Sequence, residues 1–456
     1  MYDLIVIGAG AGGYTAAIRA AKAGLKTAII EKDVIGGTCL NRGCIPVKYM
    51  LHRTEHYKEL KSAMLQQEYE GQVSLNYNML LEHMQTKIEK LAVSVESLIK
   101  AAGAEVYRGE ARFCGEMEIC IDDNKILQAK HIIIATGSRP AELAILGGKL
   151  DSVYNTDNIF VKMRKLPERL MIIGGGTAGL EMAFLFRELG TEVTLAECRD
   201  SLLGKMDRDV ESFLQRMLYR NGIRCCLSSK VKEIADDDGL EIVLSTPEKT
   251  EVLEADAALV TTGRIPVWKE LEIEKSGLRE EGAFLTVDEH YRTDREGIYA
   301  IGDVNGAHMT AYAASEQAEA VIEHITGKAC GMKKRIFPRC IFTHPEIAAA
   351  GLTEQQAKEE GRQVSVGKIL MTANGRSFAE EQDGFIKLIA DKNSGELLGG
   401  ICVCRFASEL IAQITMAVQS RMNIQQFRET VFLHPTYGES LREAAEAENG
   451  SCIYMI

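Results

Sequence analysis

The sequence has little proline, no excess of positive charge and no long hydrophobic run. Its 456 residues include only 8 Pro against 41 Gly, so its glycines are better assigned to tight backbone turns than to low-complexity linkers. A formal net charge of −12 argues against a general polyanion binder, and nucleic acid is not an expected partner. No stretch of about 18 uncharged apolar residues occurs, which excludes a membrane-spanning helix.

Cysteine is too sparse for a scaffold held together by disulfides, with 12 Cys in the chain. Met1, Tyr2 and Asp3 stand directly before an apolar run, which leaves no room for a secretion or transit signal. We therefore expect a cytoplasmic protein in which most thiols are reduced and any disulfide is catalytic. The length suits about three domains with sizeable cores.

The chain opens with the pattern of a dinucleotide-binding βαβ unit. An apolar strand at 4–7 leads into G-x-G-x-x-G, a helix over 16–23, a second strand over 27–30 and a closing acid; the glycines and the acid are Gly8, Gly10, Gly13 and Glu31. These glycines let the backbone approach a pyrophosphate at the start of the helix, where free N–H groups favour negative charge. The acid would accept hydrogen bonds from ribose hydroxyls.

The same unit recurs over 170–197. Its glycines are Gly174, Gly176 and Gly179, and Glu197 follows the first of them by 23 positions, as Glu31 follows Gly8. The sequence therefore predicts two dinucleotide sites. An acid at the strand end favours an unphosphorylated ribose and hence NAD, although Arg199 nearby leaves NADP open. A second echo pairs A-T-G-S-R-P at 135–140, which contains Thr136 and Gly137, with T-T-G-R-I-P at 261–266, which contains Gly263. Both blocks are interpreted as strand exits between domains.

Cys39 and Cys44 lie shortly after the first unit, within G-G-T-C-L-N-R-G-C-I-P-V-K at 36–48. In an ideal helix this spacing is somewhat too long for a disulfide, whose Cα atoms usually lie roughly 4.4–6.8 Å apart. The helix must therefore distort, and Gly43 and Pro46 supply the irregularity. A position at a helix start lowers thiol pKa values and favours redox cycling. The alternatives are two structural thiols or half of a zinc site, but no second Cys or His pair with suitable spacing follows nearby, so no metal is expected.

Together these motifs resemble the flavoprotein disulfide reductases, the class I pyridine nucleotide-disulfide oxidoreductases. The form C-L-N-x-G-C-I-P is most similar to the dihydrolipoamide dehydrogenase branch of that family. Later blocks resemble the family in the same order: G-I-Y-A-I-G-D at 297–303, T-H-P-E at 343–346, and H-P-T at 434–436 followed by Glu439. The resemblance spans essentially the whole chain.

The resemblance implies FAD in the first unit, NAD in the second, and a homodimer in which His434 of one subunit serves the cysteine pair of the other. The implied reaction oxidises dihydrolipoyl groups, carried on a lipoyl domain of a separate protein, and reduces NAD through the Cys39–Cys44 disulfide and FAD. Glu439 would orient His434, and Lys48 would lie by the flavin and pair with Glu181. The implied FAD contacts are Gly8, Gly10, Gly13, Glu31, Lys48, Thr136, Gly137 and Asp303; the implied NAD contacts are Gly174, Gly176, Gly179, Glu181, Glu197 and Gly263.

These anchors predict an α/β fold with two Rossmann-like domains and a C-terminal α+β interface domain. Residues 1–143 and 268–334 would form a discontinuous FAD domain, 144–267 the NAD domain and 335–456 the interface domain. In the last domain we expect strands over 364–371, 385–390 and 397–403, a hairpin turn at 391–395, and helices over 406–420 and 438–447. A long amphipathic helix is expected over 78–102, with the apolar stripe Leu80, Met84, Ile88, Leu91, Val95 and Leu98.

Some positions depart from the family pattern, and other functions stay open. Val47 and Gly438 stand where the dihydrolipoamide dehydrogenases commonly have Ser, and Tyr312 where they commonly have His. One alternative is an NADH- or NADPH-dependent reductase of another small-molecule disulfide such as glutathione. The other is a flavin-bound binding subunit that does not turn over. A mercuric reductase is disfavoured because Cys452 is single near the end of the chain, and His344 is expected to serve packing or an interface.

Overall fold

The computed structural model describes the 456-residue chain except residues 205, 238, 280–281, 329–334 and 455–456. Its N-terminal lobe is built on the predicted first βαβ unit: β1 (Tyr2–Ile7), α1 (Ala11–Lys22) and β2 (Thr27–Glu31). These strands pair in parallel and are almost wholly buried, which explains their uninterrupted apolar runs. The sheet continues through β3 (Glu105–Arg108), β6 (Lys125–Ile134), β5 (Glu118–Ile121) and β4 (Ala111–Gly115).

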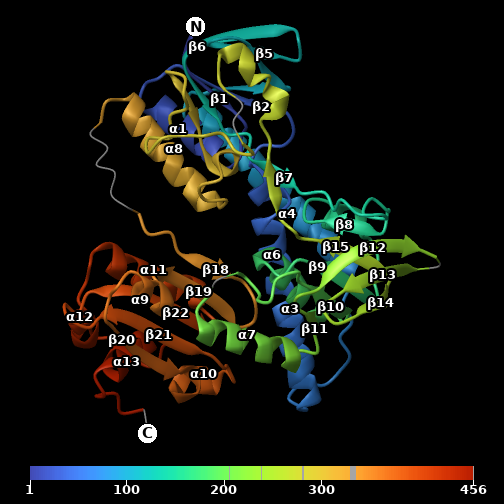
Figure 1. Cartoon of the computed structure of the whole chain (residues 1–456), viewed down its shortest axis with the longest axis vertical. Coiled ribbons are helices and arrows are strands. Elements are labelled where there is room, and N and C mark those ends of the chain that lie inside the picture. Colours follow the sequence, from blue (N-terminus) through green and yellow to red (C-terminus); the bar gives the residue numbers. More distant parts are fainter. Residues whose placement is uncertain (205, 238, 280–281, 329–334, 455–456) are drawn as a thin grey trace.

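A much later segment completes this lobe. Strand β17 (Ile298–Ala300) pairs in parallel with β6. Helix α8 (Ala311–Ile325) packs against α1, as Figure 1 shows at the top of the molecule. The lobe is therefore assembled from two stretches of chain that are separated in sequence by the second dinucleotide unit.

The second unit has the same construction. Strand β9 (Arg169–Ile173), α6 (Thr177–Glu188) and β10 (Glu192–Ala196) form its core. The parallel sheet is completed by β15 (Ala257–Val260), β8 (Val153–Asn155) and β11 (Arg224–Cys226). Helix α7 (Arg208–Arg220) precedes β11, and an antiparallel sheet of β12 (Lys230–Asp236), β13 (Leu240–Ser245) and β14 (Thr250–Ala255) lies beside it. The two blocks that were interpreted as strand exits pair with each other in antiparallel fashion, as β7 (Ser138–Pro140) and β16 (Arg264–Pro266).

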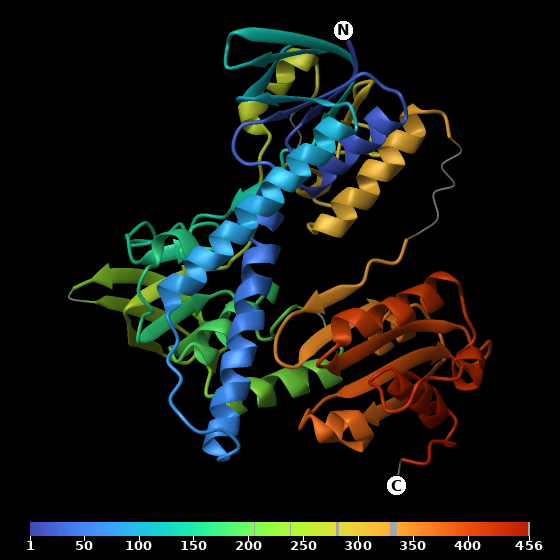
Figure 2. The same ribbon diagram turned by 180° about the vertical axis from the view of Figure 1, so that it is seen from behind.

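Two long helices run along the back of the molecule in Figure 2, α3 (Cys44–Leu65) and α4 (Tyr77–Ala101). Helix α4 is the predicted amphipathic helix, but part of the predicted stripe was wrong. Leu91 and Leu98 are exposed, whereas the buried line passes through Leu81, Met84, Ile88, Ala92, Val95 and Ile99. Both lines advance by three and four residues, so the spacing allows either, and packing turns the line that contains Ala92 and Ile99 inward.

The C-terminal domain is a five-stranded antiparallel sheet of β18 (Arg339–Ile341), β19 (Glu346–Gly351), β22 (Leu397–Cys404), β21 (Phe385–Asp391) and β20 (Val364–Leu370). The predicted hairpin joins β21 and β22, closed by the bond from Gly395 N to Asp391 O at 2.8 Å. Helices α11 (Ala407–Gln419) and α13 (Glu439–Glu448) pack on the sheet; shorter helices are α9 (Glu354–Glu359), α10 (Gly375–Ala379) and α12 (Ile424–Glu429).

The sheet has hydrophobic side chains on both faces, which explains why β21 and β22 read as continuous apolar runs. One set of side chains joins the core under α11 and α13, and the other joins the core of the rest of the molecule through Ile347, Phe385, Ile401 and Val403. The predicted α/β class with a C-terminal α+β domain is confirmed. None of the described helices combines the length and the hydrophobicity that a membrane-spanning segment needs.

Candidate active site

The two glycine turns have nearly the same geometry. A Cβ atom on Gly13 would lie 1.9 Å from the carbonyl oxygen of Gly8, and one on Gly179 would lie 1.9 Å from that of Gly174. The third glycine of each motif is thus required for the close approach of helix and strand. The middle glycines differ: a Cβ on Gly10 would meet only Gly37 Cα at 4.0 Å, and one on Gly176 would meet nothing within 4 Å. Both turns therefore leave room for a phosphate group at the helix start.

Each predicted ribose-binding acid is hydrogen-bonded to its own turn. Glu31 accepts from Ala9 N at 2.7 Å, and Glu197 accepts from Gly175 N at the same distance. The second carboxylate oxygen of each accepts a bond of 2.9 Å from the amide two residues later, Asp33 and Arg199 respectively. A carboxylate has about four acceptor sites, so capacity remains for ribose hydroxyls at both turns. The duplication seen in the sequence thus extends to individual hydrogen bonds.

Cys39 and Cys44 lie on either side of a break between two helices, as the spacing predicted. Helix α2 (Gly37–Asn41) ends where Arg42 N and Gly43 N both donate to Thr38 O, at 2.9 and 2.7 Å, and α3 begins at Cys44. The two thiols are hydrogen-bonded to each other. This bond, together with the charge of Lys48, lowers the pKa of Cys44 to about 7 against the opposing effect of burial, whereas the same bond raises the pKa of Cys39. Cys44 is thus the better thiolate and leaving group.

The Lys48–Glu181 pair joins the redox helix to the second dinucleotide unit. Lys48 Nζ lies 2.8 Å from Glu181 Oε2 and 4.2 Å from the centre of the Phe342 ring. The other carboxylate oxygen of the buried Glu181 accepts from Phe342 N at 3.1 Å. The pairing expected from the family resemblance is therefore present. It places a fixed positive charge near Cys44 and ties all three parts of the molecule together.

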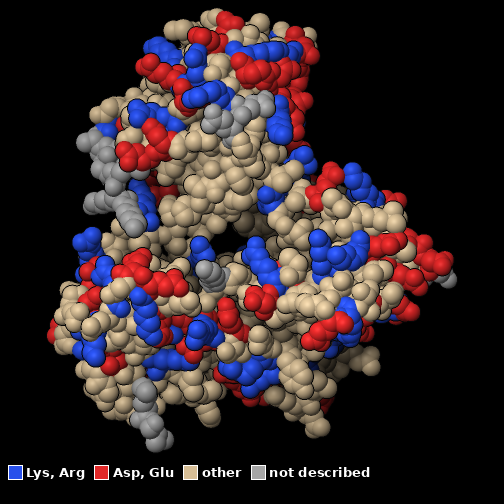
Figure 3. Space-filling view, in the orientation of Figure 1, with Lys and Arg blue, Asp and Glu red and all other residues tan. Residues whose placement is uncertain are grey.

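One large cavity of about 2260 Å³ runs between the lobes and the C-terminal domain. Figure 3 shows the molecule hollowed at its centre, between the N-terminal lobe and the parts below it. The volume exceeds the roughly 300–1,000 Å³ of an ordinary ligand pocket, so it has room for a dinucleotide and a second ligand. Of the predicted site residues it is lined by Gly8, Gly10, Glu31, Cys39, Cys44, Lys48, Thr136, Gly137, Glu181, Gly263 and Asp303. The predicted residues that do not line it are Gly13, Gly174, Gly176, Gly179, Glu197, His434 and Glu439.

Arg264, in the second strand exit, was not singled out from the sequence. Its guanidinium group contacts Asp157 at 2.8 Å and donates to the hydroxyl and the carbonyl oxygen of Ser138, each at 2.8 Å. Ser138 in turn donates to Asp303 Oδ2 at 2.5 Å. These residues hold the predicted flavin-contacting Asp303 at the crossing between the lobes. The repeated A-T-G and T-T-G blocks pointed to the two segments that carry Ser138 and Arg264. They did not reveal the contacts, because Arg264 lies more than a hundred positions from both Asp157 and Ser138.

His434 and Glu439 form a hydrogen-bonded pair on the C-terminal domain. His434 Nδ1 lies 2.8 Å from Glu439 Oε2, and the other carboxylate oxygen accepts from Thr436 N at 3.0 Å. The buried Asn374 also donates to this oxygen at 3.3 Å and to Thr436 O at 2.9 Å, a contribution that the sequence did not reveal. The side chain of His434 is 72% exposed and lies outside the cavity of its own chain. The pair is presented outward, with Nδ1 toward Glu439 and Nε2 on the other side of the ring.

His344 has a different environment from His434. Its Nδ1 lies 2.9 Å from Glu188 Oε1 and its Nε2 lies 3.8 Å from Glu55 Oε2. It thus ties the C-terminal domain to α6 and α3, in keeping with the expected packing role. Burial would lower its pKa, but the hydrogen bond to Glu188 and the charges of both glutamates raise it above its usual value.

The departures from the family pattern are accommodated locally. Tyr312 donates its hydroxyl to Pro338 O at 2.5 Å and lines the cavity. Gly438 has an ordinary helical φ of −63° before α13, so the backbone there does not require glycine and has the same conformation that Ser would adopt. Val47 packs partly buried against the main core. No cluster of three or more His, Cys, Asp or Glu side chains placed to hold a metal ion occurs among the described residues.

This fold and this arrangement of a dithiol between two dinucleotide turns define a disulfide oxidoreductase that uses a flavin and a pyridine nucleotide. Residues 2–318 match the family described as pyridine nucleotide-disulphide oxidoreductase, and residues 337–445 match its dimerisation domain. The chain therefore belongs to the pyridine nucleotide-disulphide oxidoreductase family. The predictions of an enzyme that uses FAD and NAD are confirmed, and the predicted homodimer accords with the dimerisation domain.

Among characterised relatives, the chain is similar to the dihydrolipoyl dehydrogenase of Staphylococcus aureus, with 35% identity over 460 residues that cover 100% of this chain and 98% of the relative. The corresponding enzyme of Bacillus subtilis is 33% identical over 471 residues, covering 100% and 99%. Of solved structures, the HOCl-induced flavoprotein disulfide reductase RclA of Escherichia coli superposes with a TM-score of 0.88 at 25% identity, covering 98% and 99% of the two chains.

Proposed function

We propose that this protein oxidises dihydrolipoyl groups carried by a separate protein and reduces NAD. The observation that carries the proposal is the His434–Glu439 pair together with a dithiol held across a helix break. The full-length similarity to enzymes named dihydrolipoyl dehydrogenase supports the same reaction. Because His434 lies outside its own chain's cavity, we propose that it acts on Cys39 and Cys44 of the other subunit.

The residues present fit the two cofactors. The first glycine turn, Glu31, Asp303 and the strand exit with Thr136 and Gly137 would hold FAD, because they line the cavity and leave open space at Gly10. The second turn, with Gly263, would hold NAD. Glu197 supports NAD over NADP because a 2′-phosphate would meet its negative charge. Bound FAD supplies the two-electron chemistry that side chains lack, which links the dithiol to NAD.

The thiol–disulfide steps follow from the geometry. In the oxidised enzyme His434 Nε2 accepts the proton of one substrate thiol, and the resulting thiolate attacks Cys39 Sγ. The Cys39–Cys44 bond breaks, and Cys44 leaves as a thiolate stabilised by its place at the start of α3 and by Lys48. The second substrate thiol attacks the substrate sulfur of the mixed disulfide, and its proton passes to the departing Cys39 Sγ. The cyclic disulfide is then released and Cys39 departs as the second reduced thiol.

Glu439 keeps His434 in the required tautomer. Its carboxylate accepts a hydrogen bond from Nδ1–H, which leaves Nε2 unprotonated as the base. Once His434 has taken a proton, the same carboxylate stabilises the positive imidazolium. Thr436 and Asn374 hold the second carboxylate oxygen, so Glu439 cannot turn away.

We further propose the division into an FAD domain (1–143 and 268–334), an NAD domain (144–267) and an interface domain (335–456). The pairing of β17 with β6 supports the discontinuous first domain. A cytoplasmic location is also proposed, and a reducing compartment suits a chain with many unbridged cysteines.

The test is NADH formation from dihydrolipoamide and NAD by the purified flavin-loaded protein, with NADP as the paired control. Turnover with NAD and not NADP supports the proposal, and Cys39→Ser and Cys44→Ser should each abolish it. If NADH reduces the flavin while dihydrolipoamide is inert, the dithiol serves another disulfide substrate. Turnover that survives the loss of both cysteines would contradict the mechanism.

A further inference from the structure

The stretch that follows Glu197 packs against the second glycine turn; we call residues 198–207, of which 205 lies outside the described part, the 198–207 loop. Leu203 N donates to Gly175 O at 3.1 Å. Leu202 packs so tightly on this turn that a Cβ on Gly175 would lie 2.5 Å from Leu202 Cδ2. Leu203 and Met206 also line the central cavity. The shape of the turn and of the adjoining cavity wall therefore depends on where this loop lies.

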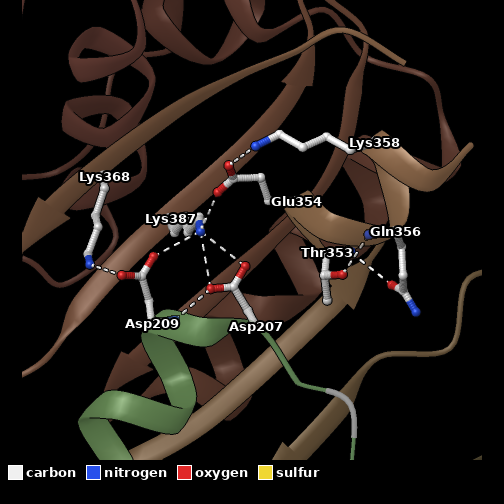
Figure 4. A network of polar contacts seen from close by, with 8 residues as sticks. All are labelled: Asp207, Asp209, Thr353, Glu354, Gln356, Lys358, Lys368 and Lys387. Atoms are coloured by element: carbon white, nitrogen blue, oxygen red, sulfur yellow. Dashed lines mark hydrogen bonds and ion pairs between the residues drawn. The ribbon is translucent and has the colours of Figure 1, made fainter. Parts of the chain in front are cut away.

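The loop ends at Asp207, which is buried and caps α7 by accepting from Asp209 N at 3.0 Å. Both carboxylate oxygens of Asp207 contact Lys387 Nζ, at 3.1 and 3.0 Å. The same ammonium group contacts Asp209 at 2.8 Å and Glu354 at 2.9 Å, as Figure 4 shows. Lys387 lies on β21 of the C-terminal domain, so the contact joins that domain to the end of the loop.

Lys387 is a rigid and charged anchor. Its side chain is only 4% exposed, and its strand is paired on both sides, to Lys368 on β20 and Ile401 on β22. Burial would favour the neutral amine, but the surrounding carboxylates outweigh it and raise the pKa of Lys387. A buried ammonium group that lost its partners would be costly, so the protein is strongly biased to the arrangement in which all three acids surround it.

The peripheral lysines of the cluster do not reach the loop. Lys368 Nζ pairs with Asp209 at 2.6 Å, and Lys358 Nζ pairs with Glu354 at 2.6 Å. Both are far more exposed than Lys387. Contact with Asp207 is thus a property of Lys387, and the peripheral lysines serve as matched controls within the same network.

We infer that Lys387 is a positioning residue for NAD: through Asp207 it fixes the 198–207 loop against the second glycine turn, so that the C-terminal domain sets the affinity for the nucleotide. This inference rests on the proposed assignment of that turn to NAD. It adds a role for the domain that carries His434, because the same domain would then contribute to both half-reactions, through His434 between α12 and α13 and through Lys387 on β21.

The decisive variant is Asp207→Asn in the purified flavin-loaded protein. Asn caps helices as well as Asp, so α7 is kept while the charge that Lys387 holds is removed. We expect the dissociation constant for NAD, measured by calorimetry, to rise about five-fold, a usual size for a coupling residue outside the ligand contacts. The KM for NAD should rise in parallel, while the rate of flavin reduction by dihydrolipoamide stays within about two-fold of wild type.

A second readout does not depend on turnover. Hydrogen exchange of the peptide over 198–204 should become faster in Asp207→Asn, because the Leu203 amide loses the support of an anchored loop. Lys387→Arg, which keeps a positive charge at the anchor, should stay closer to wild type than Asp207→Asn. Lys358→Met, which removes a lysine elsewhere in the network, should leave both NAD affinity and loop exchange unchanged.

The outcomes distinguish a failure of the proposed role of Lys387 from a failure of the proposed function. If wild type binds NAD and Asp207→Asn binds it equally well with the same loop exchange, the role of Lys387 is refuted while the proposed function stands. An equal slowing of both half-reactions would also refute it, since that marks general destabilisation. If wild type shows no NAD binding, the assignment of the second turn fails and this inference fails with it.

Discussion

Gly176 and Gly179 offer a matched pair of substitutions in the second glycine turn, because one side chain would meet ligand space and the other would meet protein. In Gly176→Ala the new Cβ finds no atom within 4 Å, and the backbone there has an ordinary extended conformation. The expected folding cost is that of a poorer N-cap residue, about 1 kcal/mol. The methyl group projects into the space proposed for the pyrophosphate, so NAD affinity should fall at least about ten-fold, or roughly 1.4 kcal/mol.

Gly179→Ala should act on stability instead. Its Cβ would lie 1.9 Å from Gly174 O, so helix α6 must move by about 1 Å from β9. Such overpacking costs about 1–3 kcal/mol, offset in part by about 1 kcal/mol from the higher helix propensity of Ala. The melting temperature should therefore fall by a few degrees, at about 2–4 °C per kcal/mol for a domain of this size.

The assay compares calorimetric NAD affinity, flavin content and thermal unfolding for both variants and wild type. FAD binding is the internal control, because the first turn is untouched and both variants should retain full flavin. If the Gly176→Ala protein binds NAD with wild-type affinity, the assignment of the open space at Gly176 to the pyrophosphate is refuted. Loss of flavin in that variant would equally contradict it, since the two units would then not be independent.

The remaining predictions concern the thiols and the two histidines. The rate at which iodoacetamide alkylates the reduced protein should rise with pH through a midpoint of about 7, the pKa of Cys44. Lys48→Met should move this midpoint upward, because a nearby positive charge is lost. A wild-type midpoint near that of a free thiol would contradict the lowered pKa of Cys44. His434→Gln should slow flavin reduction by dihydrolipoamide at least about 10²-fold, and Glu439→Ala should slow it more than it slows flavin reduction by NADH, as stopped-flow would show; equal slowing of both by Glu439→Ala refutes the orienting role. Because the folded-state pKa of His344 is raised, its stabilising effect is complete below about pH 6.5 and is lost as the pH rises through the raised value. Urea unfolding should show this slope, and His344→Gln should remove it.

How much the sequence could predict depended on the distance between interacting residues. The two turns and their acids were predictable because the glycines, the helix and the acid lie within a span of 23 positions, over which spacing dictates geometry. The break between Cys39 and Cys44 followed from the same local reasoning. In α4, by contrast, apolar spacing left two adjacent stripes possible, and only packing selected Ala92 and Ile99 over Leu91 and Leu98.

Contacts between distant segments were beyond this reasoning. Arg264 lies 107 positions from Asp157, and Lys387 lies 180 positions from Asp207. Asn374 reaches the segment of His434 across 62 positions. Each of these is a polar residue in an otherwise unremarkable strand, strand end or short helix, with no local pattern that names its partner. Such residues are found only when the fold brings the segments together.

The different tasks of the two duplicated units follow from what packs against each turn. A Cβ on Gly37 would lie 2.7 Å from Gly10 Cα, so the segment that carries Cys39 can rest directly on the first turn only because it has glycine there. The second turn is instead covered by the 198–207 loop, whose end the C-terminal domain holds through Lys387. The segment that carries the dithiol is therefore fixed on the first turn, which suits the proposal that this turn holds the cofactor that stays bound. The second turn is bordered by the 198–207 loop, which is held to it by the bond from Leu203 N to Gly175 O and to the C-terminal domain by Asp207. Two domains therefore contribute to the wall beside the turn where we propose that a nucleotide enters and leaves in every turnover.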